Sequence, residues 1–256
     1  MPRLPEEAAR EIFFPRPDMP FGPPAAGAWD HLFEVDGETL RLRIFPGPTD
    51  APSILFFHGN GETARDYDHA ADYFRALPCT LLAAEYRGYG PCSGDPSMNT
   101  FLDDAAATLD EALDLLSGEG RRTDLAVMGR SLGSAPAIHL AASAPDRIVA
   151  LIVESGFALT TPLLDLIGID PERMGITEEQ GPENLDKMRT VSMPALIIHA
   201  ERDELLPVGN AELLREAAAG EVELLRVPEA GHNDIQAKAG AAYFEAIGRL
   251  LGRAFR

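Results

Sequence analysis

The pattern of hydrophobic and polar residues changes near Ser53. Before it, the segments HLFEV and TLRLRIF flank the pair Asp36-Gly37, and the second segment alternates apolar and polar residues. This pattern predicts an antiparallel β-hairpin at one edge of a sheet. After it come short unbroken apolar runs separated by helical stretches, namely SILFFHG, TLLAAEYRGYG, DLAVMGRSLG, IVALIVESGF, PALIIHAERD and ELLRVPEAGH. Such strands alternating with helices predict a parallel sheet covered on both faces.

Five stretches carry apolar residues at roughly helical spacing. They are Thr63–Ala76, Thr100–Leu116, Leu132–Ala144, Gly209–Ala219 and Asp234–Ala254. The expected fold is therefore α/β, with a doubly wound, mostly parallel sheet. Between Phe157 and Pro194 lies a segment with several glycines and prolines and no long helical period, and loops of that length commonly cap a site or move. We expect a small cap at residues 158–190.

The amino-terminal residues are rich in proline, as in FFPRPDMPFGPP. Because proline interrupts both helices and strand ladders, residues 1–28 are expected to form an irregular arm laid over the domain. A chain of 256 residues is within the range of a single α/β domain. The remaining residues, 29–256, are therefore expected to form one domain.

Composition narrows the classes of partner. Hydrophobic residues make up 45% and charged residues 25%, which is typical of a soluble globular protein. The net charge of -19 opposes binding to nucleic acid or to anionic membranes. The amino terminus, MPRLPEEAAREIFF, lacks the apolar core of a signal peptide or anchor, so no membrane insertion and a cytoplasmic location are expected. Cys79 and Cys92 are expected to be reduced thiols.

The motif G-x-S-x-G occurs at Gly129–Gly133, with Ser131 at its centre. Small residues around a serine allow a tight turn from strand to helix that exposes the hydroxyl. The run LAVM before the motif indicates a buried strand, and LGSAPAIHLAA after it indicates a helix. This context favours Ser131 as a nucleophile over a structural serine in a turn.

A serine nucleophile needs a base and a group that orients the base. We expect His232, in PEAGHND, to be the base, because it follows an apolar run and precedes the last helix; a helix-capping or turn role is the alternative. We expect Asp203, which follows the run ALIIHA, to be the acid, and its alternative role is that of a turn or N-cap residue. Glu154, at the end of the preceding strand, competes for the role of the acid. The order Ser131, Asp203, His232 is that of the α/β-hydrolase triad.

Acyl transfer also needs donors for the oxyanion. The loop HGNGE follows the strand SILFF, and we expect its first donor to be Asn60, with Gly61 as the second choice. The amide after the nucleophile, that of Leu132, would supply the other donor. A plain glycine-rich turn is the alternative interpretation.

The segments HGNGE, EYRGYGPCSGDPS, GRSLGSAP, HAERDELLP and EAGHND resemble, in order, the motif series of the α/β-hydrolase superfamily from about Leu32 to the carboxyl terminus. The resemblance is closest to small, short-capped esterases, acyl thioesterases and peptidase-like hydrolases. It implies that the RGYG segment is architectural, with Arg87, Tyr89 and Ser93 as supports.

Other motifs carry less weight. No metal site or nucleotide-binding fingerprint is apparent, so we expect no metal and no cofactor. Four other histidines are expected to be packing or surface residues, namely His58, His69, His139 and His199. The apolar cap residues could line an acyl pocket or seal the core; they are Leu159, Leu163, Leu164, Leu166, Ile167, Ile169, Met174 and Ile176. The acidic run Glu178, Glu179 and Glu183 indicates a solvated face.

The sequence thus predicts a carboxylesterase-like serine hydrolase that acts through an acyl-enzyme on ester or thioester bonds of small-molecule acyl substrates. Two classes of alternative stay open. One is a serine peptidase, an amidase or a carbon–carbon bond hydrolase with the same machinery. The other is a hydrolase-like binding protein without turnover. The oligomeric state is left open.

Overall fold

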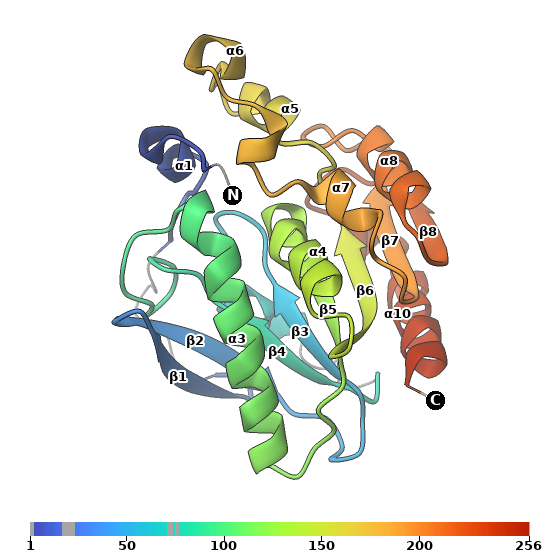
Figure 1. Ribbon diagram of the computed structural model, residues 1–256. Helices are drawn as coiled ribbons and strands as arrows, with labels where there is room; N and C mark the ends of the chain where they lie inside the picture. Colours follow the sequence, from blue (N-terminus) through green and yellow to red (C-terminus); the bar gives the residue numbers. More distant parts are fainter. Residues whose placement is uncertain (1–2, 17–23, 71–73, 75–76, 256) are drawn as a thin grey trace.

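Eight strands form one sheet in the order β1-β2-β4-β3-β5-β6-β7-β8 (Figure 1). The computed structural model describes residues 3–16, 24–70, 74 and 77–255. The strands are β1 Trp29–Val35, β2 Glu38–Phe45, β3 Ser53–Phe57, β4 Thr80–Ala84, β5 Leu125–Arg130, β6 Ile148–Glu154, β7 Ala195–Ala200 and β8 Val222–Val227. The pairs β1–β2 and β2–β4 are antiparallel and the others are parallel. The predicted α/β fold, with its amino-terminal hairpin, is confirmed.

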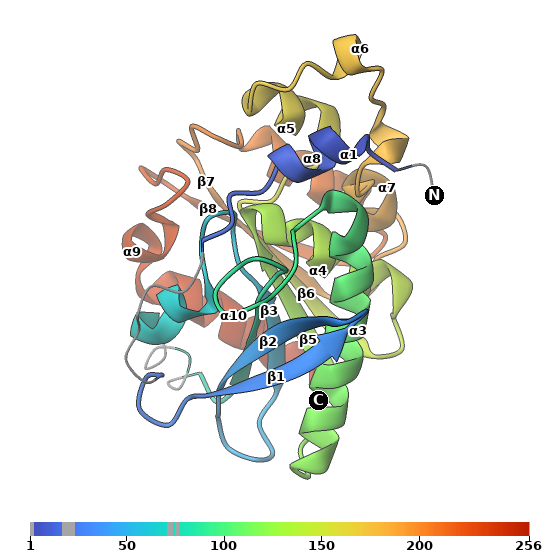
Figure 2. The ribbon, with the colours of Figure 1, turned by 90° about the vertical axis from the view of Figure 1, so that its left-hand side faces the viewer.

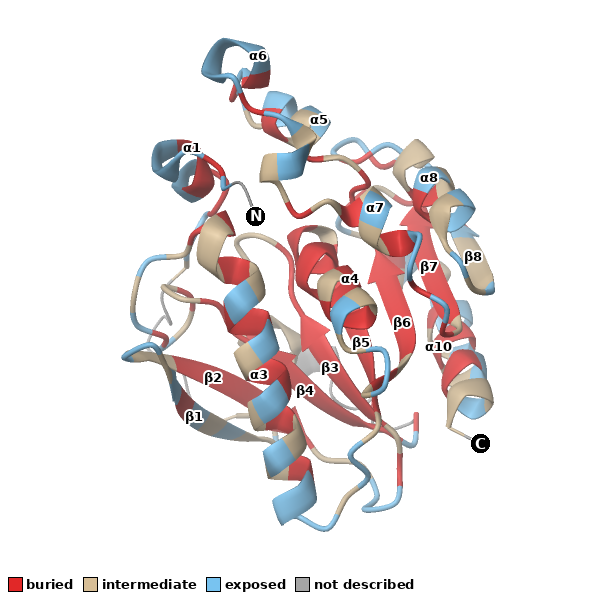
Figure 3. Ribbon diagram, viewed as in Figure 1, coloured by how far each residue is buried: buried red, intermediate tan, exposed pale blue. Residues whose placement is uncertain are grey.

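Helices cover both faces of the sheet. On one face lie α3 Met98–Gly118, α4 Ser134–Ser143 and α8 Gly209–Ala217, and on the other lies α10 Ala241–Ala254 (Figures 1 and 2). Successive residues of β3 alternate between the two apolar cores, with Leu55 in one and Phe56 in the other. The central strands, β3 to β7, are therefore apolar over most of their length, and they are almost entirely buried (Figure 3).

Two predicted helices differ from the structure. The stretch Asp234–Ala254 divides into α9 Ile235–Ala239 and α10, because Gly240 has a φ of 55° and a left-handed residue ends a helix. In the stretch Thr63–Ala76 the structure has a 3-10 helix, Ala64–Ala70, and residues 71–73 and 75–76 lie outside the described residues. The other three helical stretches are present with shifted ends.

The amino-terminal arm was expected to be irregular, and this is wrong for part of it. Residues Glu6–Glu11 form the helix α1, which starts directly after Pro5. The segment between Pro5 and Pro15 contains no proline, so its backbone N–H groups are free to form helical hydrogen bonds. The proline-dense residues 17–23 lie outside the description.

The expected cap segment contains short helices between β6 and β7. They are α5 Thr160–Leu166, α6 Pro171–Met174, the 3-10 helix Glu178–Gln180 and α7 Asn184–Met188. Glu178 was expected on a solvated face, but its carboxylate accepts hydrogen bonds from the backbone N–H groups of Thr160 and Thr161, both at 2.7 Å. It therefore ties one part of the cap to another.

Both cysteines are reduced thiols, as predicted, and both are buried. Burial raises the pKa of the Cys79 thiol to about 12, because the thiolate would lose its hydration. In the part of the chain that the structure describes, no helix combines the length and the apolar character needed to cross a membrane.

Candidate active site

The turn after β5 places Ser131 at its apex with a φ of 50°, in the left-handed region that disfavours side chains. The flanking glycines explain how the turn closes. A Cβ atom on Gly129 would lie 2.1 Å from the carbonyl oxygen of Gly133, and one on Gly133 would lie 2.2 Å from that of Phe57. No larger residue fits at either position, so the G-x-S-x-G motif is a packing requirement of this strained turn.

Ser131, His232 and Asp203 form a continuous chain of polar contacts. His232 Nε2 lies 3.0 Å from Ser131 Oγ, and His232 Nδ1 lies 2.9 Å and 3.0 Å from the two carboxylate oxygens of Asp203. The side chains of Asp203 and His232 are buried. The structure thus brings together three residues that lie up to 101 positions apart in sequence.

The carboxylate of Asp203 has further partners. Its Oδ1 accepts hydrogen bonds from the backbone N–H groups of Leu205 and Leu206, at 3.0 Å and 2.7 Å, and its Oδ2 accepts one from Ser155 Oγ at 2.9 Å. Burial opposes ionisation, but the hydrogen bonds and the nearby His232 outweigh it, so the pKa of Asp203 lies below its ordinary value. Sequence reasoning missed Ser155, which has a φ of 43° directly after β6.

Glu154, the competing acid, is engaged elsewhere. Its Oε1 lies 3.2 Å from Arg130 Nε, and its Oε2 accepts a hydrogen bond of 2.5 Å from the hydroxyl of Tyr243. Of the two candidate carboxylates, Asp203 is therefore the one in contact with the imidazole of His232.

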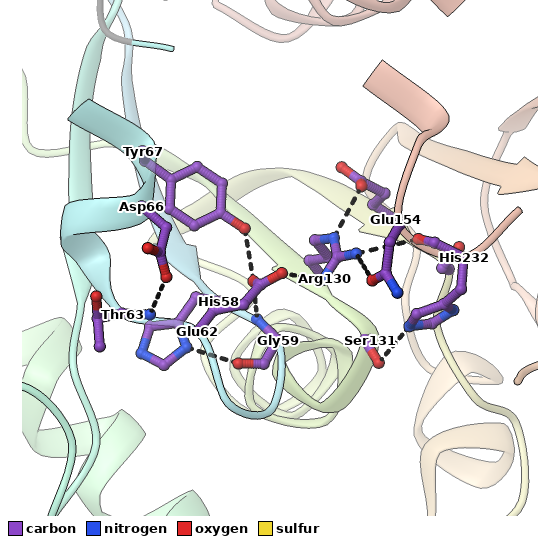
Figure 4. Close-up of polar contacts among 12 residues, drawn as sticks. His58, Gly59, Glu62, Thr63, Asp66, Tyr67, Arg130, Ser131, Glu154 and His232 are labelled. Carbon is purple, nitrogen blue, oxygen red and sulfur yellow. Dashed lines mark hydrogen bonds and ion pairs between the residues drawn. The ribbon is translucent and has the colours of Figure 1, made fainter. Parts of the chain in front are cut away.

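Arg130 links the loop after β3, the end of β6 and the loop that carries His232 (Figure 4). Its guanidinium donates to the backbone carbonyl of His232 at 3.0 Å and to Asn233 Oδ1 at 2.9 Å, and it forms ion pairs with Glu62 and Glu154. Burial would lower the pKa of Arg130, but the charges of these two carboxylates raise it above its ordinary value. Sequence reasoning did not single out Arg130. A charged residue at the end of a buried apolar strand was the available signal.

Glu62 extends this network to the loop after β3. Its Oε2 accepts hydrogen bonds from the backbone N–H of Gly59 and from the hydroxyl of Tyr67, each 2.7 Å long. Arg130 and Glu62 therefore connect the loop that carries His232 with the loop that carries Asn60. The same two side chains leave no room for a larger residue at Gly59, where an added Cβ would lie 2.6 Å from Arg130 Nη1 and 3.0 Å from Glu62 Oε2.

Asn60 and Leu132, the predicted oxyanion donors, both line the cavity beside Ser131. In the described part of the chain, neither backbone N–H donates a hydrogen bond to another group. The side chain of Asn60 is engaged, because its Oδ1 accepts from the hydroxyl of Tyr89 at 2.7 Å and its Nδ2 donates to the carbonyl of Ile12 at 2.6 Å. Both polar atoms of the Asn60 side chain therefore have protein partners, which leaves its backbone N–H as the candidate donor.

A cavity of about 340 Å³ opens at Ser131. Most of its lining is apolar, and no carboxylate of the described residues lines it. The lining residues are Ile12, Phe14, Asn60, Arg130, Ser131, Leu132, Phe157, Leu163, Leu166, Ile167, Leu205, Leu206, His232 and Asn233. The cap residues named above divide between two roles, since Leu163, Leu166 and Ile167 line the cavity whereas Leu164, Ile169 and Ile176 are buried in the core.

The other histidines include two that are fully buried. His58 Nε2 lies 3.1 Å from the carboxylate of Glu85, and His199 Nε2 donates to the carbonyl of Leu206 at 2.8 Å. The side chain of His69 lies outside the described residues. Among the residues that are described, no group of three or more histidine, cysteine, aspartate or glutamate side chains is arranged to hold a metal ion.

The RGYG supports make the contacts expected of them. The guanidinium of Arg87 donates two hydrogen bonds to Asp104, at 2.8 Å and 2.6 Å. Ser93 Oγ donates to Glu38 at 2.5 Å, and Tyr89 is fully buried with its hydroxyl on Asn60. Tyr89 thus supports the loop after β3 as well as the edge of the sheet.

Comparison with known proteins gives a consistent set of relatives. Residues 49–168 match the family model described as serine aminopeptidase, S33. The chain is 29% identical over 241 residues to the alpha/beta hydrolase domain-containing protein WAV2 of Arabidopsis thaliana, covering 84% of this chain and 75% of the relative. It is 30% identical over 213 residues to the protein bem46 of Schizosaccharomyces pombe, covering 80% of this chain and 68% of that relative.

Two solved structures share the fold. The esterase Pf2001 of Pyrococcus furiosus superposes with a TM-score of 0.75 at 16% identity, covering 94% of this chain and 99% of the esterase. Est1E of Butyrivibrio proteoclasticus, solved with ferulic acid bound, superposes with a TM-score of 0.73 at 19% identity, covering 88% of this chain and 99% of Est1E.

Proposed function

Because the chain belongs to the α/β-hydrolase family, we propose that it is a serine hydrolase that cleaves ester or thioester bonds of small acyl substrates through an acyl-enzyme. The observation that carries this proposal is the hydrogen-bonded chain from Ser131 through His232 to Asp203 at the base of an apolar cavity. The partner of this site is a small-molecule acyl compound, and the chemistry needs no cofactor.

In the first half of the reaction, His232 Nε2 takes the proton of Ser131 Oγ, 3.0 Å away, as the oxygen attacks the carbonyl carbon. Asp203 accepts the Nδ1–H of His232, holds the imidazole in the required tautomer and stabilises the imidazolium that forms. The backbone amides of Asn60 and Leu132 stabilise the oxyanion. His232 then donates its proton to the leaving alcohol or thiol, and the acyl group stays on Ser131.

In the second half, water enters, His232 removes its proton, and the resulting hydroxide attacks the acyl carbon. The tetrahedral intermediate collapses, His232 returns the proton to Ser131 Oγ, and the carboxylic acid leaves. Each proton therefore passes through one imidazole whose position Asp203 and the Arg130 contacts maintain.

The second candidate is an aminopeptidase, which the matching family model suggests. An aminopeptidase must bind the free ammonium group of its substrate, and a carboxylate is the usual partner for such a cation. Among the described residues no carboxylate lines the cavity. The lining therefore favours uncharged acyl groups, and esters or thioesters over peptides with a free amino terminus.

The test combines covalent labelling with turnover. The wild-type chain is expected to react with a fluorophosphonate probe and to hydrolyse p-nitrophenyl esters, whereas Ser131→Ala does neither. Ser143→Ala, a change on α4 away from the cavity, is the matched control and should behave like the wild type. Asp203→Asn should lower kcat by on the order of 10⁴-fold. A wild-type chain that is folded but neither labelled nor active, or labelling that survives Ser131→Ala, would reject the proposal and favour a binding protein without turnover.

Substrate preference needs a second measurement. A panel of esters, thioesters and aminoacyl amides that share an acyl group ranks the leaving groups by kcat/KM. Higher kcat/KM for esters or thioesters supports the assignment, and higher kcat/KM for aminoacyl amides supports the aminopeptidase instead.

A further inference from the structure

We propose that the amino-terminal segment, residues 3–16, is part of the substrate site, where it forms one wall of the acyl-binding cavity and holds the loop that carries Asn60. This inference rests on the proposed function and extends it to the acyl group. The sequence showed no chemistry in this segment. Its contacts in the folded chain are what assign the role.

The first observation is a clasp between the segment and the loop after β3. Asn60 Nδ2 donates to the carbonyl of Ile12 at 2.6 Å, and Asn60 Oδ1 accepts from the backbone N–H of Phe14 at 2.8 Å. The hydroxyl of Tyr89 lies 2.7 Å from the same Oδ1 and 3.1 Å from the Phe14 nitrogen. The side chain of Asn60 thus bonds the backbone of the segment on both sides of Phe13, and the backbone N–H of the same residue is the proposed oxyanion donor.

The second observation is that the segment is anchored at both ends. Leu4, Ala8 and Ile12 are buried in the main apolar core. The ring of Phe13 packs edge-on against that of Phe101, with the ring centroids 5.2 Å apart. Beyond the clasp, the carbonyl of Arg16 accepts a hydrogen bond from Gly90 at 2.9 Å. In Figures 1 and 2, α1 lies at the same end of the molecule as the cap helix α5. The segment is therefore held in place at the cap end of the molecule, where Ile12 and Phe14 line the cavity.

The third observation concerns exposed apolar side chains. Six large ones are exposed in the described residues, and three of them, Phe14, Leu166 and Leu205, line this one cavity. The Phe14 side chain is 59% exposed even though the backbone N–H of the same residue is hydrogen-bonded to Asn60. Exposed apolar side chains that converge on a cavity from three separate segments indicate a binding site for an apolar group.

These contacts define the class of acyl group. The wall, the cap and the loop after β7 surround the cavity with apolar side chains, and the polar groups are gathered around Ser131. We therefore infer an uncharged, apolar acyl chain that extends from the Ser131 ester past Phe14. Each buried methylene raises affinity about fourfold. Chains that reach Phe14 should thus be preferred over acetyl.

Phe14→Ala tests the wall. This variant is expected to lower kcat/KM for p-nitrophenyl octanoate roughly fourfold to fifteenfold more than kcat/KM for p-nitrophenyl acetate, the worth of one or two methylene contacts. Leu32→Ala is the matched control, because Leu32 is 56% exposed but lies on β1, outside the cavity. It should change neither substrate. Equal effects of Phe14→Ala on both esters, or no effect on either, would overturn the role of Phe14.

Hydrogen exchange tests the segment directly. The wild-type chain is labelled at Ser131 with an octyl or an ethyl fluorophosphonate, and exchange is followed in residues 3–16. The octyl adduct is expected to slow exchange in this segment at least severalfold more than the ethyl adduct. Equal exchange in the two adducts would refute the wall while leaving the hydrolase assignment intact, whereas failure of both probes to react with Ser131 would refute the proposed function itself.

Discussion

Replacing Arg130 by methionine is expected to reduce both stability and turnover. The change removes the cation that pairs with Glu62 and Glu154 and the donors to the carbonyl of His232 and to Asn233. Breaking a buried ion pair from one side costs about 3–5 kcal/mol. In a chain of this size each kcal/mol corresponds to roughly 2–4 °C, so Tm should fall by on the order of 10 °C.

Turnover should fall for a separate reason. Without Arg130 the loop that carries His232 loses its link to the loop that carries Asn60, and a displacement of about 1 Å in such a site costs about 10²-fold in rate. We expect kcat to fall by about that factor while KM for p-nitrophenyl butyrate changes less than threefold. Arg130→Lys keeps the charge but not the planar fork of donors, so it should recover more stability than kcat.

The control is Arg43→Met. Arg43 is also buried and pairs with two carboxylates, Asp30 at 2.8 Å and Asp68 at 3.0 Å, but β2 contributes no residue to the cavity. Tm is followed by differential scanning fluorimetry, and kcat is measured well below the lowest Tm. Arg43→Met should lower Tm and leave kcat unchanged. An Arg130→Met chain that is folded and turns over at the wild-type kcat, or equal losses of kcat in both variants, would refute the argument that Arg130 positions the site.

Three further outcomes are expected. Gly133→Ala should lower the free energy of unfolding by about 1–3 kcal/mol and abolish fluorophosphonate labelling, because the added Cβ would lie 2.2 Å from the Phe57 carbonyl oxygen. Gly209→Ala is the control: its Cβ would meet nothing within 4 Å, so it should change neither measurement. The pKa of Asp203 is lowered from an ordinary 3.8, so the ionised carboxylate stabilises the fold above that pH, and this contribution is lost as the pH falls below it. In urea titrations, the difference in free energy of unfolding between wild type and Asp203→Asn should therefore narrow from pH 6 to pH 3. A difference that stays constant would contradict this. With its pKa raised to about 12, Cys79 should resist iodoacetamide at pH 8 in the native chain and react after unfolding, as peptide mass mapping would show.

The strands and the fold class followed from sequence because their determinants are local. A run such as SILFF is apolar at every position, and β3 is indeed buried on both faces. The pair Asp36-Gly37 has φ values of 51° and 82°, as a two-residue hairpin turn needs. Helix ends were less predictable. The break at Gly240 depends on one residue's backbone angle, and the prolines of the amino-terminal arm concealed α1.

The positions of Ser131, Asp203 and His232 could also be anticipated, because each follows a strand of a parallel sheet and the carboxyl ends of such strands meet at one edge. The sequence favoured Asp203 but left Glu154 as a competitor, since both satisfy that rule. The choice depended on side-chain direction, which only packing settles: Glu154 points to Arg130 and Tyr243, and Asp203 points to His232.

By itself, then, the sequence determined the order of elements, the two-faced sheet and the loops that carry the candidate chemistry, because periodicity and turn composition act over a few residues. Only the tertiary structure decided which side chains support those loops. The link from Arg130 to Glu62 and the clasp of Asn60 on Ile12 span 68 and 48 positions in sequence. Contacts of that range have no periodic signature, because they arise only when separate segments pack against the same edge of the sheet.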